Sequence, residues 1–208
     1  MLTRVQNRLR ATFLEWRSQR PYVRVWNDGP LLVLPGVLDP VATKVGAWLA
    51  DAVDAGSGER WVDMGSGTGI VGLALAARGV QVLAVDIDPV CVRNTRANAV
   101  LRDVVLDAVE SDLFVSVAGT FDGVVYNVPF WPGEPRGRFG TAFYAGENFR
   151  GIRRYVREAP AHARRVLVAL SEAGARHPDA RDALGPHRVL KRERFRSEWL
   201  TLCELQPP

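Results

Sequence analysis

One stretch of the sequence decides the fold: Val62-Asp63-Met64-Gly65-Ser66-Gly67-Thr68-Gly69. The apolar residues that open it predict a buried strand, and the apolar residues after Gly69 recur at the spacing of a helix. Three glycines spaced two residues apart let the turn between them approach a ligand closely, because glycine has no side chain and tolerates positive φ. The following helix points its N-terminal amides at the turn. The stretch therefore predicts a nucleotide-type cofactor site on an α/β sheet.

Two kinds of cofactor are compatible with this turn. Gly67-Thr68-Gly69-Ile70-Val71-Gly72 also satisfies G-x-G-x-x-G, the pattern of dinucleotide-binding dehydrogenases. However, the helical pattern has begun at Ile70, so the third glycine would lie inside the helix. Asp63 ends the strand just before the first glycine, where a carboxylate would repel a pyrophosphate but suits a ligand that carries an ammonium group. A dehydrogenase is therefore the weaker alternative.

Strands and helices alternate along most of the chain. Seven mostly apolar segments predict strands, at residues 60–64, 81–85, 104–109, 121–126, 166–170, 189–195 and 199–205. The main helices between and after them are predicted at 69–78, 88–100, 147–164 and 173–184. Such alternation implies parallel pairing with right-handed crossovers, and the last two strands form an antiparallel hairpin. The predicted fold class is α/β, with a Rossmann-like, doubly wound, mostly parallel seven-stranded sheet.

The N-terminal part predicts a short extension over residues 1–35, and residues 36–208 predict the main domain. Residues 2–16 carry apolar side chains at helical spacing, and two short strands at 23–26 and 31–34 flank the turn Asn27-Asp28-Gly29-Pro30. Asp39 is a plausible N-cap ahead of Pro40, so a helix is expected from there to about Val53.

Composition limits the classes of protein. The formal net charge is +4, and the basic surface permits a nucleic acid or another acidic partner, although a merely solvated surface is equally compatible. No apolar run is long enough to span a membrane, and arginines interrupt the N-terminus where a signal peptide would be apolar. The two cysteines, Cys91 and Cys203, have no metal-binding spacing. We therefore expect a cytoplasmic protein with reduced thiols and no metal site.

Polar side chains follow four of the predicted strands: Asp63, Asp86, Asp112 and Asn127. In a doubly wound sheet, ligands bind beyond the carboxyl ends of the strands, so these side chains are candidates for one site. Asp86 follows the glycine turn by the distance expected of an acid that binds the ribose hydroxyls. Ile87 would then lie against the adenine face, although simple core packing explains it almost as well.

A second motif follows the fourth strand: Tyr126-Asn127-Val128-Pro129-Phe130-Trp131-Pro132. It resembles the N-P-P-Y motif of amino-methyltransferases, with Val128 in place of the first proline, and D-x-G-x-G-x-G resembles motif I of class I S-adenosylmethionine (SAM) methyltransferases. Over about residues 34–170 the chain resembles the HemK/PrmC-like enzymes of the methyltransferase small domain group. These enzymes methylate glutamine amides of proteins or exocyclic amines of nucleic-acid bases.

The resemblance implies a role for each candidate residue. The methionine part of SAM would lie on Asp63, Gly65, Gly67 and Gly69, and its adenosine on Asp86, Ile87, Asp112 and Leu113. The methyl acceptor would be held by Asn127, Pro129 and Phe130, with Asn127 also bordering the cofactor.

The motif after the fourth strand has a chemical rationale. An amide or exocyclic amine is a poor nucleophile because its lone pair is delocalised. The Asn127 side chain and the Val128 carbonyl can each accept one N–H, which turns the lone pair toward the methyl group. Phe130 would stack on the planar acceptor and stabilise the developing positive charge. The resulting prediction is a SAM-dependent N-methyltransferase of a planar nitrogen.

Two alternatives stay open. One is a small-molecule methyltransferase of specialised metabolism, and the other is a non-catalytic SAM- or nucleic-acid-binding module. A long loop at residues 131–144 adjoins the predicted acceptor site and combines aromatic side chains with Arg136 and Arg138. Such a loop suits recognition of a base or an acidic group, or forms a lid. The acceptor is therefore a protein, a nucleic acid or a small molecule, and no membrane partner is expected.

Overall fold

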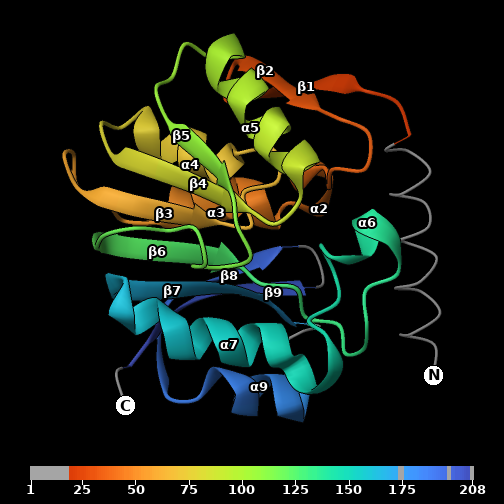
Figure 1. The fold of residues 1–208 in the computed structure, drawn as a ribbon, viewed down its shortest axis with the longest axis vertical. Helices are drawn as coiled ribbons and strands as arrows, with labels where there is room; N and C mark the ends of the chain where they lie inside the picture. Colours follow the sequence, from red (N-terminus) through yellow and green to blue (C-terminus); the bar gives the residue numbers. More distant parts are fainter. Residues whose placement is uncertain (1–18, 173–175, 196–197, 207–208) are drawn as a thin grey trace.

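A seven-stranded sheet runs through the middle of the molecule (Figure 1). The computed structural model describes residues 19–172, 176–195 and 198–206. In spatial order the strands are β5 (Asp107–Glu110), β4 (Gln81–Asp86), β3 (Arg60–Met64), β6 (Phe121–Asn127), β7 (Ala163–Ser171), β9 (Glu198–Leu205) and β8 (His187–Phe195).

The pairing of these strands confirms the predicted fold class. All pairs from β5 to β7 are parallel, and the pairs β7–β9 and β9–β8 are antiparallel. The chain builds outward from β3 to β5 and then returns to place β6 on the other side of β3. Where strand order reverses in this way, adjacent crossovers leave on opposite faces and open a crevice at the carboxyl ends of the strands.

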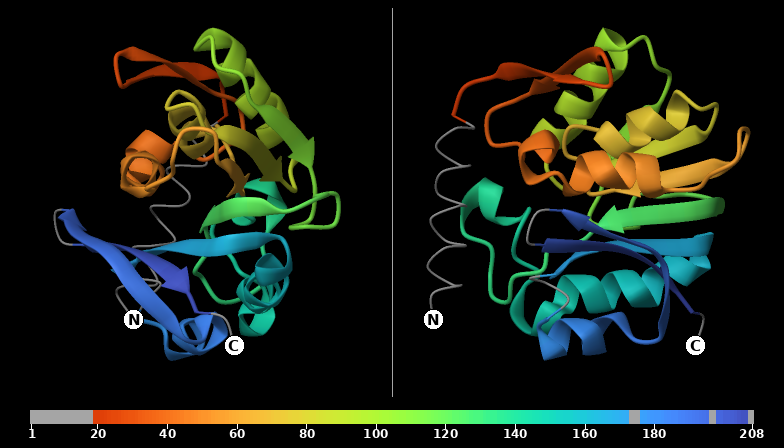
Figure 2. Two further views of the ribbon diagram at one scale, coloured as in Figure 1. Left: turned by 90° about the vertical axis from the view of Figure 1, so that its left-hand side faces the viewer. Right: turned by 180° about the vertical axis from the view of Figure 1, so that it is seen from behind.

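Helices cover both faces of the sheet (Figures 1 and 2). They are α2 (Pro40–Thr43), α3 (Val45–Ala52), α4 (Ile70–Ala76), α5 (Pro89–Leu101), α6 (Gly137–Gly140), α7 (Arg150–Glu158) and α9 (Pro178–Leu184), with 3-10 turns η1 (Glu147–Phe149) and η2 (Ala159–Ala161). Helices α7 and α9 contribute to one hydrophobic cluster, and α3, α4 and α5 contribute to another. Val124 of β6 belongs to the first cluster and Val125 to the second, as expected for a strand buried on both faces.

A separate two-stranded sheet packs against α5 (Figure 1). Its strands, β1 (Tyr22–Trp26) and β2 (Gly29–Val33), are joined by Asn27 and Asp28, both at positive φ, as a tight hairpin turn requires. The buried Asn98 of α5 joins this hairpin to the glycine turn after β3. Its side chain accepts from Leu32 N–H (2.7 Å) and donates to Leu32 O (2.8 Å) and to Thr68 O (2.9 Å).

Two predicted helices are interrupted. The helix expected from Asp39 to Val53 breaks at Lys44, which adopts φ 67° and separates α2 from α3. The Thr43 hydroxyl bonds back to the Asp39 carbonyl at 3.3 Å, a local bond that competes with helix propagation. The helix expected at 147–164 is regular only over α7, because Asn148 and Phe149 have positive φ and Pro160 provides no N–H.

The third predicted strand is also shorter than expected. It begins at Asp107 rather than Val104, because Val104 N–H caps the end of α5 by donating to Ala99 O (2.9 Å). The helix predicted within residues 2–16, and the start of the one predicted at 173–184, lie outside the described residues. Among the helices of the described ranges, none combines the length and apolar character needed to cross a bilayer.

We predict that Asn98→Ala lowers the free energy of unfolding by about 2–4 kcal/mol, because several buried groups lose their hydrogen-bond partner together. Urea denaturation measures this difference. The matched control is Arg93→Ala on the exposed side of α5, which should change stability by less than about 0.5 kcal/mol. Equal stability of the two variants would contradict the bridging role of Asn98.

Candidate active site

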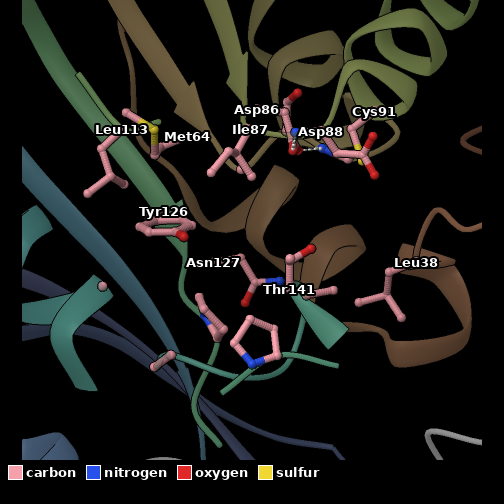
Figure 3. Close-up of a pocket in the computed structure, with 18 of the residues that line it drawn as sticks. Leu38, Met64, Asp86, Ile87, Asp88, Cys91, Leu113, Tyr126, Asn127 and Thr141 are labelled. Carbon is pink, nitrogen blue, oxygen red and sulfur yellow. Dashed lines mark hydrogen bonds between the residues drawn. The ribbon is translucent and has the colours of Figure 1, made fainter. Parts of the chain in front are cut away.

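A cavity of about 870 Å³ opens at the carboxyl ends of the central strands (Figure 3). Segments far apart in the sequence line it, within residues 36–46, 63–71, 86–91, 111–113, 126–129 and 135–157. This is the crevice that the reversal of strand order creates, and its volume is in the range of small-molecule sites.

The glycine turn forms the floor of one side of the cavity. Gly65, Gly67 and Gly69 have φ of 64°, 57° and 81°, a region that residues with side chains rarely adopt. Gly65 and Gly67 line the cavity, whereas Gly69 is not among its lining residues and is the N-cap of α4. The glycine spacing is thus explained by the backbone of the turn, and direct ligand contact is available at the first two glycines.

Asp63 lies at the end of β3 and is only 4% exposed. Its Oδ2 accepts a hydrogen bond from Gly72 N–H at 2.9 Å. Burial raises the pKa of Asp63 to about 7; the Gly72 bond opposes this shift and the charge of Asp86 adds to it. A cationic group placed in this part of the cavity would favour the ionised carboxylate.

Asp86 connects the end of β4 to the glycine turn. Its Oδ2 accepts from Gly67 N–H and its Oδ1 from Asp88 N–H, both at 2.9 Å. The Cys91 thiol also hydrogen-bonds to this carboxylate, so three of its roughly four acceptor positions are used and about one is left for a ligand hydroxyl. The neighbouring Ile87 is 54% exposed and also lines the cavity, so its side chain is available to a ligand rather than packed in the core.

Asp112 and Leu113 follow β5 and complete this side of the cavity. Arg154 of α7 donates to Asp112 Oδ2 at 2.5 Å and to the Asp112 carbonyl at 3.0 Å. This pairing occupies one carboxylate oxygen and leaves Oδ1 for a ligand amino group. Leu113 adopts φ 53°, an uncommon conformation for a residue with a side chain.

The segment after β6 alternates between the cavity and the core. Asn127 and Pro129 line the cavity, whereas Val128 and Phe130 belong to the hydrophobic cluster beneath it. Figure 3 shows Asn127 beside Thr141, across the cavity from Asp86 and Ile87. Phe130 is 9% exposed and is not a lining residue, so the stacking role predicted for it has no support in this structure.

The loop over residues 131–144 is ordered by its own aromatic side chains. Trp131 stacks on Phe143 with ring centroids 4.8 Å apart, and Tyr144 meets Trp131 edge-on at 5.5 Å. Backbone bonds join Trp131 to Phe143 and to Ala145. Tyr144 lines the cavity, so the loop places at least one aromatic ring beside the strand end that carries Asn127.

Two features of the cavity were not predicted from the sequence. One is Tyr126, which lines the cavity directly before Asn127. The other is a row of arginines from α7 that also line it: Arg150, Arg153, Arg154 and Arg157. Their spacing of three and four residues places them on one helix face, a signal that was present in the sequence. The sequence alone does not show that this helix face borders the cavity, because that depends on how α7 packs against the sheet.

Among the residues that the structure describes, no group of three or more His, Cys, Asp or Glu side chains is arranged to hold a metal ion.

Comparisons with known proteins agree with this geometry. Residues 39–143, half of the chain, match the family described as "Methyltransferase small domain". The chain is 35% identical over 164 residues to ribosomal RNA small subunit methyltransferase C of Chromohalobacter salexigens, a match that covers 76% of this chain and 45% of that protein. It is 33% identical over 132 residues to a putative protein N5-glutamine methyltransferase of Methanocaldococcus jannaschii, covering 61% and 66%. The chain thus spans about half to two thirds of the length of these relatives.

The same fold occurs among solved structures. A 16S rRNA N2 methyltransferase of T. thermophilus, in complex with AdoMet and guanosine, superposes with a TM-score of 0.63 at 20% identity, covering 90% of this chain and 50% of that one. The glycine turn and the strand-end acids lie within the segment that matches the family. The chain belongs to the methyltransferase small domain family.

Proposed function

We propose that this protein is a SAM-dependent N-methyltransferase that acts on a planar amide or exocyclic amine nitrogen. The observation that carries the proposal is that Asn127 and Pro129 share one cavity with the glycine turn and Asp86. Cofactor-binding and acceptor-binding groups therefore face a common space, as direct transfer between two bound molecules requires.

The residues of the cavity fit this cofactor. Asp86 has an acceptor position left for a ribose hydroxyl, and Asp63 offers a carboxylate to the ammonium group. Thr68 lines the cavity and is 2% exposed, yet its Oγ1 has no hydrogen-bond partner among the described residues. Buried polar atoms are rarely left unpaired, so this hydroxyl supports a polar ligand beside the turn. SAM supplies an electrophilic methyl group on a sulfonium.

The protein acts on the acceptor mainly by orientation. Asn127 Oδ1 and the Val128 carbonyl accept the two N–H groups and fix the nitrogen with its lone pair toward the cofactor. Their dipoles also stabilise the positive charge that develops on the nitrogen during transfer. Val128 needs only its backbone for this role, and its buried side chain anchors that backbone in the core. No strong base is required before the methyl group has moved.

The relatives indicate which acceptors to test. One is named as a ribosomal RNA methyltransferase and another as a protein glutamine methyltransferase, so the acceptor proposed here is a nucleic-acid base or a protein glutamine. Residues 131–146 are proposed to recognise it. The domain boundary near residue 35 and a cytoplasmic location stay predictions from the sequence.

The test is incubation of the protein with methyl-labelled SAM and fractionated cell extract. Label in RNA, DNA or protein would support the proposal, and identification of the modified nitrogen would assign the acceptor. Label confined to small molecules would favour the alternative of a small-molecule methyltransferase. Binding of NAD without binding of SAM would overturn the proposal.

Asp86→Ala should weaken SAM binding by about 1.5–3 kcal/mol, because the ribose loses a charged hydrogen-bond acceptor. Isothermal titration calorimetry measures the change. Asp107→Ala, at an exposed carboxylate on β5 outside the cavity, is the control and should bind SAM like the wild type. Since Asp86 also braces the glycine turn, thermal unfolding of both variants is measured in parallel.

SAM affinity should fall by up to tenfold per pH unit as the pH is lowered below about 7. Burial raises the pKa of Asp63 to about 7, so below that pH the carboxyl of the free protein is increasingly protonated, whereas the ammonium group of the cofactor binds the deprotonated form better. Calorimetry between pH 5.5 and 8 in two buffers detects the proton that is released. Asp63→Asn should bind more weakly with a flatter profile, and equal wild-type affinity at pH 5.5 and 7.5 would contradict this role.

Asn127→Ala should slow methyl transfer about a hundred- to a thousandfold, because one preorganised acceptor worth about 2.7–4 kcal/mol in the transition state is lost. SAM affinity should stay within about twofold of the wild type. Single-turnover transfer at saturating SAM measures the rate, and Asn127→Asp, which keeps an acceptor oxygen, should be less impaired. A wild-type rate for Asn127→Ala would show that Asn127 does not hold the acceptor.

A further inference from the structure

The ring of Tyr126 is fixed between the cofactor turn and the core. A Cβ atom at Gly65 would lie 2.7 Å from Tyr126 Cε2, so the ring packs directly against the backbone of the turn. On another side it meets the ring of Tyr155 edge-on, with centroids 5.1 Å apart. Figure 3 shows its ring lying between Met64 and Leu113 on one side and Asn127 on the other. The ring therefore has little freedom to turn away from the cavity.

The hydroxyl of Tyr126 has no hydrogen-bond partner among the described residues. Tyr155 shows the usual outcome for a buried tyrosine: its hydroxyl donates to Leu167 O at 3.1 Å. Tyr126 is partly exposed, and it lines the cavity. Burial, together with the charges of Asp86 and Asp112, raises the pKa of Tyr126 well above its ordinary value. The group is thus a neutral phenol at physiological pH.

We propose that the Tyr126 hydroxyl is a specificity-determining group that contacts the charged sulfonium end of SAM and thereby favours the methyl donor over its neutral demethylated product. The inference rests on the proposed function, because it needs SAM in this cavity. Tyr126 touches Gly65, which borders the methionine part of the cofactor, and directly precedes Asn127, which borders the acceptor nitrogen. The transferred methyl group must lie between these two positions, so a hydroxyl at Tyr126 borders its path.

The charge of the ligand explains the expected selectivity. A phenol oxygen carries lone pairs that attract a sulfonium and its polarised methyl hydrogens, and this attraction is stronger in a cavity partly shielded from water than in bulk solvent. S-Adenosylhomocysteine (SAH) has a neutral sulfur at the same place and gains little from the same oxygen. Contacts to the ribose, adenine and amino acid portions, in contrast, are shared by both molecules.

The experiment compares Tyr126→Phe with Tyr155→Phe by calorimetry with SAM and with SAH. Both substitutions remove one phenol hydroxyl and keep the ring. Tyr126→Phe should lose about three- to tenfold in affinity for SAM and less than about twofold for SAH. Tyr155→Phe should unfold at a lower temperature but keep the wild-type ratio of the two dissociation constants. In turnover assays, Tyr126→Phe should raise KM for SAM and show stronger relative inhibition by SAH.

The outcomes separate this inference from the proposed function. If Tyr126→Phe weakens SAM and SAH equally, the hydroxyl binds a portion common to both, and the sulfonium assignment is wrong. If it changes neither affinity, the hydroxyl does not contact the cofactor. In both cases the wild type still binds SAM and the proposed function stands. If the wild type binds neither molecule, the proposed function itself fails.

Discussion

The hydrogen bond from Gly67 N–H to the Asp86 carboxylate connects two strand ends on which the whole site depends. The glycine turn leaves β3, Asp86 ends β4, and the 2.9 Å bond fixes one against the other. Asn98 supports the same turn from behind through Thr68 O and extends the connection to the N-terminal hairpin. The glycines of the turn have no side chains to pack, so the hydrogen bonds to Asp86 and Asn98 help to fix its conformation. A cofactor that binds here meets a surface whose donors and acceptors are already in place.

The part of the site that follows from chain periodicity could be predicted from the sequence. The order of apolar segments predicts the parallel sheet, and polar residues at strand ends must then meet at one edge, which is where Asp63, Asp86, Asp112 and Asn127 lie. The N-cap at Asp39 could also be predicted from the sequence. Its side chain accepts from Val41 N–H and Ala42 N–H, as an N-cap does. These features need only the neighbouring sequence and the general rules of α/β folds.

What could not be predicted depends on the direction of single side chains after the strands end. The sequence predicted Phe130 as the aromatic side chain of the acceptor site, yet Phe130 packs in the core and Tyr126 lines the cavity. The backbone conformation after Asn127 determines which of the two rings faces the cavity. This segment is neither helix nor strand, so no regular spacing of residues predicts its side-chain directions. The pairing of Arg154 with Asp112 could not be predicted from the sequence either, because 42 residues separate the partners and only the packing of α7 brings them together. Such contacts arise from tertiary structure, and they decide which atoms are left for a ligand.

The two sides of the cavity differ in how firmly they are held. On the cofactor side, Asp63 and Asp86 are buried and bonded to backbone amides, so moving either leaves a buried group without a partner. On the other side, Arg150 and Arg153 of α7 pair with acids of other segments at the surface, for example Arg153 with Asp182 at 2.6 Å. Exposed ion pairs of this kind contribute only about 0–1 kcal/mol, so an incoming group can replace one at small cost. Substitutions at Arg150 or Arg153 therefore leave Asp63 and Asp86 undisturbed, because backbone amides and not α7 hold these two acids. Arg154 differs from them, because its pairing with Asp112 couples α7 to the end of β5.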